Sequence, residues 1–210
     1  MGLEPGDHLW YYETDDLTST AASIPRQAWF PGSANETDYQ GHGKEIFHYV
    51  FHSDDEIRMG QPQMRSGDGS FAWLNNNPGN LTGHPGGPDY GQYWDKFSWH
   101  NFLIFPSFQT GYDAIASFLQ NPGNGYLDLN LVQAFQRYAP SGDGGNDPVA
   151  YATDVATAAA VPTSTLIGEL TPEQMVAVQD KITQIEGSRE GTIYSGVDQL
   201  PAAVQTAYYE

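Results

Sequence analysis

Residues 75–80 divide the chain into two parts with different sequence patterns. The block reads Asn-Asn-Asn-Pro-Gly-Asn, and it cannot form a regular helix or strand. Pro78 lacks an amide donor and fixes φ, Gly79 permits a left-handed turn, and asparagine side chains bond to nearby backbone. Before the block, residues 45–52 are β-branched and aromatic and have the length of a strand. After it, helix signals dominate.

The second half carries several signals that begin or end helices. The expected starts are Ser107 or Thr110, Asp128, Asp147 and Thr171. Asp147 precedes Pro148, an N-cap followed by proline at the first helical position, and this helix should reach about residue 160. Thr171 opens a capping box, and Gly187 ends its helix. We also expect a strand within residues 97–105 and irregular structure in residues 1–35.

These patterns predict an α+β, mainly helical fold, with a small β-containing lobe on a helical body. We expect residues 1–70 to form an N-terminal arm and the β-containing lobe, 71–190 the helical body, and 191–210 a C-terminal tail, all in one structural domain. A chain of 210 residues is long enough to bury such a core. Its 39% apolar and 13% aromatic content is typical of globular proteins.

Charge and composition exclude several classes of function. The net charge of −18 comes from 26 acidic against 8 basic residues and repels phosphate backbones, so we expect no nucleic-acid partner. The longest strongly apolar run, residues 102–105, is far shorter than the roughly 20 residues of a membrane span, so we expect no membrane insertion. The first residues lack a secretory signal pattern, and we expect a domain of a larger protein.

Metal-dependent and peptidase chemistry are also disfavoured. His48 and His52 would lie on one face of a strand about 13 Å apart, too far to share an ion. The chain has no cysteine and no His-Glu-x-x-His motif, which disfavours a zinc amidase. It also lacks the Gly-x-Ser-x-Gly nucleophile turn of serine hydrolases. We therefore expect an activity that needs no cofactor.

Several short motifs follow one another along residues 71–190. They are Trp73-Leu-Asn-Asn-Asn-Pro-Gly-Asn-Leu81, Phe102-Leu-Ile-Phe-Pro-Ser107, Thr110-Gly-Tyr-Asp-Ala-Ile115, Arg137-Tyr-Ala-Pro140, Asn146-Asp147 with Tyr151, and Leu170-Thr-Pro-Glu-Gln174 with Glu186-Gly187. In this order they resemble a family of phage-associated and secreted peptidoglycan hydrolases. Similar domains occur in phage lysis and tail proteins and at the ends of type VI secretion effectors. One departure is Gly145, where many relatives have glutamate.

The resemblance implies a lysozyme-like fold and a muramidase that cuts between N-acetylmuramic acid and N-acetylglucosamine. Its partner would be the peptidoglycan glycan strand, with an immunity protein as a second partner if the chain is an antibacterial effector. It would act in the periplasm or cell wall of a target cell, as an effector or a phage lysis domain. Two alternatives stay open: a lytic transglycosylase, and a non-catalytic peptidoglycan-binding or virion structural module, which Gly145 favours.

Carboxyl groups are the catalytic candidates. Glycosidic hydrolysis needs a protonated acid at the leaving oxygen and usually a second carboxylate. Glu45 leads an apolar strand, an environment that keeps a carboxyl group protonated, and Glu36 is its candidate partner. Eight residues separate the two, and phage-type lysozymes space a glutamate and a second carboxylate similarly. Residues 54–56 are a fallback, although adjacent acids usually form a solvated turn. We expect Glu186 to cap structure at its helix end.

Amide and aromatic side chains are the candidates for substrate binding. Amides both donate and accept hydrogen bonds, so one or two members of the asparagine block are expected to contact sugar and the others to hold the turn. The block comprises Asn75, Asn76, Asn77 and Asn80. Tyr138 is a further candidate, with an internal position as the alternative. Four rings could stack on sugar faces, with core packing expected for at least half: Tyr90, Tyr93, Trp94 and Trp99.

Overall fold

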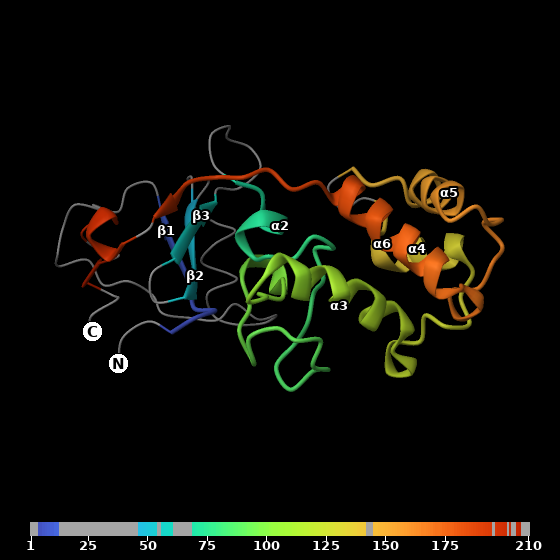
Figure 1. Cartoon of the computed structure of the whole chain (residues 1–210), viewed down its shortest axis with the longest axis horizontal. Coiled ribbons are helices and arrows are strands. Elements are labelled where there is room, and N and C mark those ends of the chain that lie inside the picture. The colour runs from blue at the N-terminus through green and yellow to red at the C-terminus, as the bar shows by residue number, and fades with distance from the viewer. Residues whose placement is uncertain are drawn as a thin grey trace. The chain divides into compact units, whose positions relative to one another are not determined.

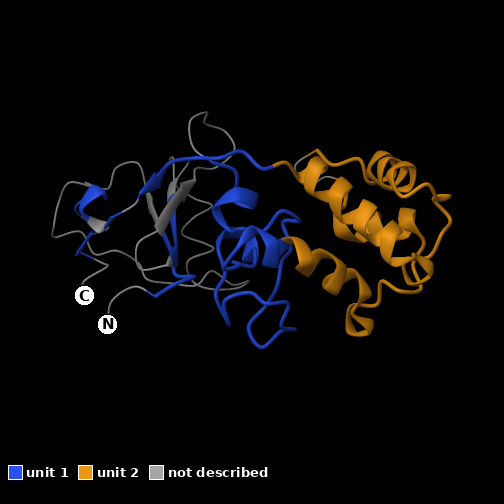
Figure 2. Cartoon of the chain, viewed as in Figure 1, with its two compact units in different colours: residues 1–111, 188–210 blue, residues 112–187 orange. Residues whose placement is uncertain are grey.

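The chain consists of two compact units (Figure 2), one formed by residues 1–111 and 188–210 and the other by residues 112–187. The structure, a computed structural model, describes residues 4–12, 46–53, 56–60, 69–141, 145–194, 196–200, 202, 205 and 206. Within these ranges, no helix has both the length and the apolar character that crossing a membrane requires.

The first unit contains a four-stranded antiparallel sheet with the strands in sequence order (Figure 1). Its strands are β1 (His8–Tyr12), β2 (Ile46–Ser53), β3 (Glu56–Gly60) and β4 (Ile193–Tyr194). The strand predicted for residues 45–52 is confirmed as β2. The irregular structure predicted for residues 1–35 is wrong at β1, because this segment pairs with β2, with His8 opposite Val50. Because β1 is stabilised by pairing with a strand far along the sequence, its own residues carry no local pattern that predicts it.

Apolar side chains from the sheet and from short helix α2 form the core of the first unit. Helix α2 spans Phe71–Leu74, and Ser70 caps it by accepting a hydrogen bond from the Trp73 amide. Trp73 and Leu74 pack against Val50 of β2 and against Ile104. Full burial of such side chains stabilises a fold by roughly 1.5–3 kcal/mol each. The C-terminal segment is tied to the same place, because the Ser70 amide donates to the Arg189 carbonyl at 2.8 Å.

Residues 97–105 form a tight turn instead of the predicted strand. Two isolated bridges, Phe97–Leu103 and Thr82–Phe102, flank the short 3-10 helix η1 (Trp99–Asn101). His100 and Asn101 have positive φ angles of 58° and 60°, which a strand cannot accommodate. The strand prediction is therefore wrong: the apolar residues here are buried because they line a turn that packs on the asparagine block.

Four helices account for most of the second unit, and the first of them starts at the end of the first unit. They are α3 (Phe108–Gln120), α4 (Leu131–Tyr138), α5 (Pro148–Ala158) and α6 (Pro172–Glu186), with 3-10 turns η2 (Pro122–Asn124) and η3 (Ile167–Glu169) between them. A last turn, η4 (Val197–Gln199), belongs to the first unit. Helix α3 begins in the first unit and continues into the second.

Helix caps match the sequence at three of the predicted starts. Ser107 directly precedes α3 and accepts a hydrogen bond from the Thr110 amide at 3.1 Å. Asp147 accepts hydrogen bonds from two amides of α5, and Thr171 forms a capping box with Gln174 at α6. The predicted cap at Asp128 is wrong. Asn130 caps α4 instead, because its side chain accepts from the Gln133 amide while the Gln133 side chain accepts from the Asn130 amide.

The core of the second unit is apolar, and α5 packs against both α4 and α6. Fully buried side chains come from each of its helices: Ile115, Leu119, Leu131, Phe135, Val155, Val178 and Ile182. Gln179 of α6 donates to the Tyr112 carbonyl of α3 at 2.8 Å, and the Tyr112 hydroxyl donates to Asp180 at 2.7 Å. These two bonds fix α6 beside α3.

The α+β, mainly helical fold class is confirmed by this set of elements. The unit boundaries differ from the ranges expected from the sequence. Residues 71–111, assigned to the helical body, group with the sheet, and so do residues 188–210. The difference arises because the asparagine block packs against β2 and because β4 completes the sheet.

Candidate functional site

The predicted catalytic carboxylates lie largely outside the described residues. This holds for Glu36, Glu45, Asp54 and Asp55. Glu45 directly precedes Ile46, the first residue of β2, and Glu56 is the first residue of β3. The catalytic roles of Glu45 and Glu36 therefore stay predictions.

Asn77 holds the asparagine block together. Its Nδ2 donates to the carbonyls of Leu81 and Leu103 at 2.8 and 3.0 Å, and its Oδ1 accepts from the Leu81 amide at 2.9 Å. The side chain is fully buried. Because these bonds use both ends of the amide, Asn77 joins the block to residues 97–105 and has no surface to offer a ligand.

Asn76 connects the block to β2. Its Nδ2 donates to Nδ1 of His52 at 3.1 Å and to the Phe105 carbonyl at 3.3 Å. The other His52 nitrogen, Nε2, lies 2.6 Å from the Leu74 carbonyl. A carbonyl only accepts, so the bond requires the proton on Nε2 and leaves Nδ1 as the acceptor for Asn76. A neutral, buried His52 thus bridges β2 and the block.

Asn75 and Asn80 differ from their neighbours. Asn75 is fully buried, and neither polar atom of its side chain has a hydrogen-bond partner in the described part of the chain. Asn80 is half-buried and has a φ of 46°. Their hydrogen bonds identify Asn76 and Asn77 as residues that hold the turn, and burial leaves Asn75 no surface for a ligand. Asn80 is therefore the member of the block with surface for the predicted sugar contact.

Gly111 shows that two of the sequence motifs meet in space. A Cβ atom at this position would lie 1.9 Å from the carbonyl oxygen of Asn76. The first turn of α3 therefore approaches the asparagine block so closely that only glycine fits. The pairing explains why the block and the glycine at the helix start occur together in this chain.

Three further motif residues converge in the second unit. Tyr138 ends α4, Tyr151 lies in α5, and Glu186 ends α6. The Tyr151 hydroxyl donates to Oε1 of Glu186 at 2.9 Å. The rings of Tyr138 and Tyr151 meet edge to face with centroids 6.2 Å apart. Glu186 therefore joins the end of α6 to α5, in keeping with the structural role expected for it.

Both phenols of this cluster stay protonated. Burial raises the pKa of Tyr138 well above its usual value, and the Glu186 charge adds to the effect. Burial likewise raises the pKa of Tyr151, with contributions from Tyr138 and Glu186. Tyr138 is half-buried and also packs on Phe118 and Phe135. Most of its ring is thus internal. This matches the alternative given for Tyr138, an internal position, and not a role in substrate binding.

A pair of buried histidines was not foreseen from the sequence. His8 Nε2 and His48 Nδ1 lie 2.8 Å apart, and their rings stack with centroids 5.0 Å apart. Burial lowers the pKa of His8 to about 3. Burial, with smaller contributions from His8 and His100, lowers the pKa of His48 well below its usual value. Both rings are therefore neutral near pH 7.

The histidines give no support to a metal site. His48 faces His8, whereas His52 bonds to Leu74 and Asn76, so the two histidines of β2 have different partners. In the described part of the chain, no group of three or more histidine, cysteine, aspartate or glutamate side chains could hold a metal ion.

The four aromatic candidates for sugar stacking separate into different environments. The Tyr93 hydroxyl donates to the His52 carbonyl, and Trp99 packs on the rings of His48 and His100. Tyr90 is half-buried. Trp94 has 59% of its surface exposed. Core packing thus accounts for Tyr93 and Trp99, and Trp94 is the most available ring.

The departure at Gly145 has a backbone explanation. Gly145 has a φ of +84°, and a Cβ built there would have no neighbour within 4 Å. A glutamate at this position would fit sterically but would adopt a left-handed backbone that costs roughly 1–2 kcal/mol. The loop before Asp147 is therefore shaped for glycine in this chain.

Comparison with known proteins adds no assignment. No known protein-family model matches the chain, and no characterised protein shows significant sequence similarity to it. A proposal about function therefore depends on the motifs and on the geometry described above.

Proposed function

We propose that the chain is a peptidoglycan glycan-strand hydrolase, a muramidase that cleaves between N-acetylmuramic acid and N-acetylglucosamine. The observation that carries this proposal is the meeting of motif residues that are far apart in the sequence. Tyr138, Tyr151 and Glu186 come from three motifs of the resemblance and form one cluster.

A second contact supports the same proposal. Gly111 lies against the backbone of Asn76, so the motif at the start of α3 and the asparagine block form one packed unit. Asn77 extends that unit to Leu103, in the aromatic motif of residues 102–107. Residues of three motifs are thus in contact within the first unit, which supports reading them together.

The chemistry is assigned to two carboxyl groups that precede β2 in the sequence. Glu45 protonates the leaving glycosidic oxygen, and Glu36 acts as base, nucleophile or stabiliser of the positive charge that develops on the sugar. Glu186 is a weaker candidate because one of its oxygens already accepts the Tyr151 hydrogen bond. Catalysis is thus assigned to residues that precede the motifs in the sequence, and structural support to the motifs within residues 71–190.

The proposed setting is the cell wall or periplasm of a target bacterium. The domain would arrive there as part of a larger antibacterial effector or phage lysis protein, and an effector would have an immunity protein as its partner. A net charge of −18 opposes binding to walls rich in anionic polymers. A thin peptidoglycan layer with little phosphate is the better substrate, and added salt should relieve the repulsion that remains.

The test compares Glu45→Gln and Glu36→Gln with the unmodified protein in the release of reducing ends from purified sacculi. We expect Glu45→Gln to lose at least a hundredfold in rate, because general acid catalysis contributes that much. Glu190→Gln is the matched control, since Glu190 is an exposed glutamate with no role in the proposed mechanism. Full activity in Glu45→Gln, with the same melting temperature as the control, would remove Glu45 from the mechanism.

A further inference from the structure

Trp94 stands apart from the other aromatic side chains of the first unit. It is 59% exposed, whereas Trp73 is 7% exposed and Phe97 is 3% exposed. Within the described part of the chain its ring contacts no other aromatic ring, unlike Trp99, which packs on three. Leaving an indole in water forfeits much of the stabilisation that its burial would provide. Trp94 therefore presents a broad apolar surface to solvent.

The backbone on both sides of Trp94 is fixed. Before it, the Tyr93 amide donates to the Ile104 carbonyl at 2.9 Å, and the Tyr93 hydroxyl donates to the His52 carbonyl. After it, Asp95 has a φ of 50° and accepts from the Gly86 amide at 3.0 Å. Trp94 thus projects from a segment held on each side, which reduces the entropy lost when a ligand binds.

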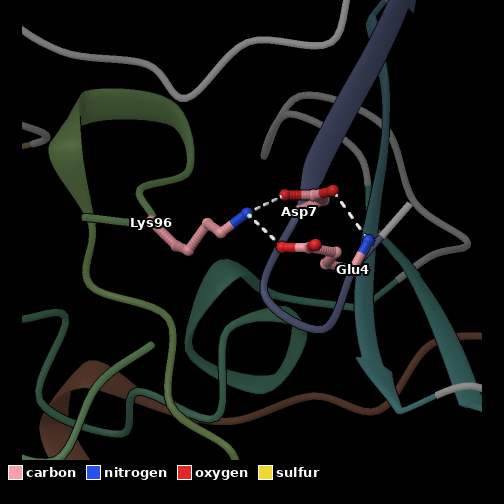
Figure 3. Close-up of polar contacts among 3 residues, drawn as sticks. All are labelled: Glu4, Asp7 and Lys96. Carbon is pink, nitrogen blue, oxygen red and sulfur yellow. Dashed lines mark hydrogen bonds and ion pairs between the residues drawn. The ribbon is translucent and has the colours of Figure 1, made fainter. Parts of the chain in front are cut away.

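Lys96 adds a second anchor, two residues after Trp94. Its ammonium group donates to Asp7 and lies 3.9 Å from a carboxylate oxygen of Glu4 (Figure 3). The Glu4 amide donates to the other oxygen of Asp7 at 2.8 Å, so both acids belong to one small network (Figure 3). The loop that carries Trp94 is in this way attached to the chain just before β1.

We propose that Trp94 is a stacking platform for a sugar ring of the glycan strand. This inference rests on the proposed function and names one residue of its substrate site. One face of a pyranose ring presents C–H bonds, which carry partial positive charge and are attracted to the electron-rich face of an indole. Stacking of this kind involves no ionic charge, so the net charge of −18 does not oppose it.

The test measures binding of soluble N-acetylglucosamine oligomers by calorimetry and of purified sacculi by co-sedimentation. The full chain is used, with Trp94→Ala and Trp94→Phe as variants. We expect Trp94→Ala to weaken binding about tenfold, as loss of an aromatic contact predicts. Trp94→Phe should recover most of the affinity, because it restores a ring face.

Phe108→Ala is the matched control, since it removes another exposed ring of the first unit, 47% exposed. It should leave binding unchanged. Equal affinity of Trp94→Ala and the unmodified protein would overturn the stacking role, while cleavage of sacculi by both would leave the hydrolase proposal standing. If the unmodified protein neither bound nor cleaved sacculi, the proposed function would fail and the inference with it. Unchanged melting temperatures in all variants establish that folding is not the cause.

Discussion

The two units are stabilised in different ways. The second unit has capped helices and an apolar core, with Asp147 and Thr171 beginning two of its helices. The first unit buries polar side chains as well, among them Asn77 and His52, and uses them to hold loops against the sheet. The comparison indicates that the stability of the second unit depends mainly on apolar burial. The stability of the first unit also depends on buried hydrogen bonds, and loss of either partner leaves a polar group unsatisfied.

The largest expected effect comes from adding a side-chain atom where α3 contacts the asparagine block. Alanine in place of glycine normally stabilises a helix by about 1 kcal/mol. Gly111→Ala should instead destabilise by about 3 kcal/mol or more, because its Cβ would lie 1.9 Å from the Asn76 carbonyl oxygen. Urea unfolding measures the change in the free energy of unfolding.

Gly145→Ala is the control for this prediction. It tests backbone strain without a steric clash, since a Cβ there has open space around it. A cost of only about 1 kcal/mol is expected from the left-handed φ angle. If Gly111→Ala were as stable as the unmodified protein, the close approach of α3 to the block would be wrong, and with it the main support for treating those motifs as one unit.

The second prediction compares two buried asparagines of the same block. Asn77→Leu should destabilise by about 3 kcal/mol, because it leaves the Leu81 amide and two carbonyls without their partner. Asn75→Leu should be close to neutral, because the side-chain amide of Asn75 makes no hydrogen bond within the described residues. Chemical denaturation of both variants at one pH gives the comparison. Equal losses would contradict the different roles assigned to the two side chains.

The third prediction concerns pH and the buried histidine pair. The pKa of His8 is about 3 in the folded state, against about 6.5 in an unfolded chain. Between these values the unfolded state binds more protons, so stability is full above pH 6.5 and falls as the pH is lowered toward 3. From pH 7 to pH 4.5, His8 alone should cost roughly 2–3 kcal/mol.

His8→Phe should reduce this acid sensitivity, since a phenylalanine ring does not take up a proton. His84→Gln is the control, because His84 is exposed, and its pH dependence should match that of the unmodified protein. The free energy of unfolding at pH 7 and pH 4.5 is the measurement. Identical slopes for His8→Phe and the control would show that His8 is not buried as a neutral ring.

Sequence reasoning worked where structure is set by neighbouring residues. The helix starts at Asp147 and Thr171 and the end at Gly187 follow from contacts within one turn. It failed where the partner is distant. Strand β1 needs β2, forty residues further on, and the histidine pair needs the same two strands. The Asp128 cap was misplaced because Asn130 completes a capping box with Gln133.

The candidate site was predictable only in part. The sequence indicated the asparagine block and the four aromatic candidates, but which of these side chains are structural and which are exposed depends on tertiary contacts. Asn77 is structural because Leu103 lies beside it, and Trp94 is available because Tyr93 takes the internal position. The catalytic assignment of Glu45 and Glu36 has its basis in sequence alone.

The most direct measurement is mass spectrometry of the soluble products after the unmodified protein acts on purified sacculi. A muramidase releases muropeptides that end in a reducing N-acetylmuramic acid, and this is the result we expect. Products lighter by one water, with an anhydro sugar, would identify a lytic transglycosylase instead. Sacculi that bind the protein but release no soluble fragments would contradict the hydrolase proposal and establish a binding module.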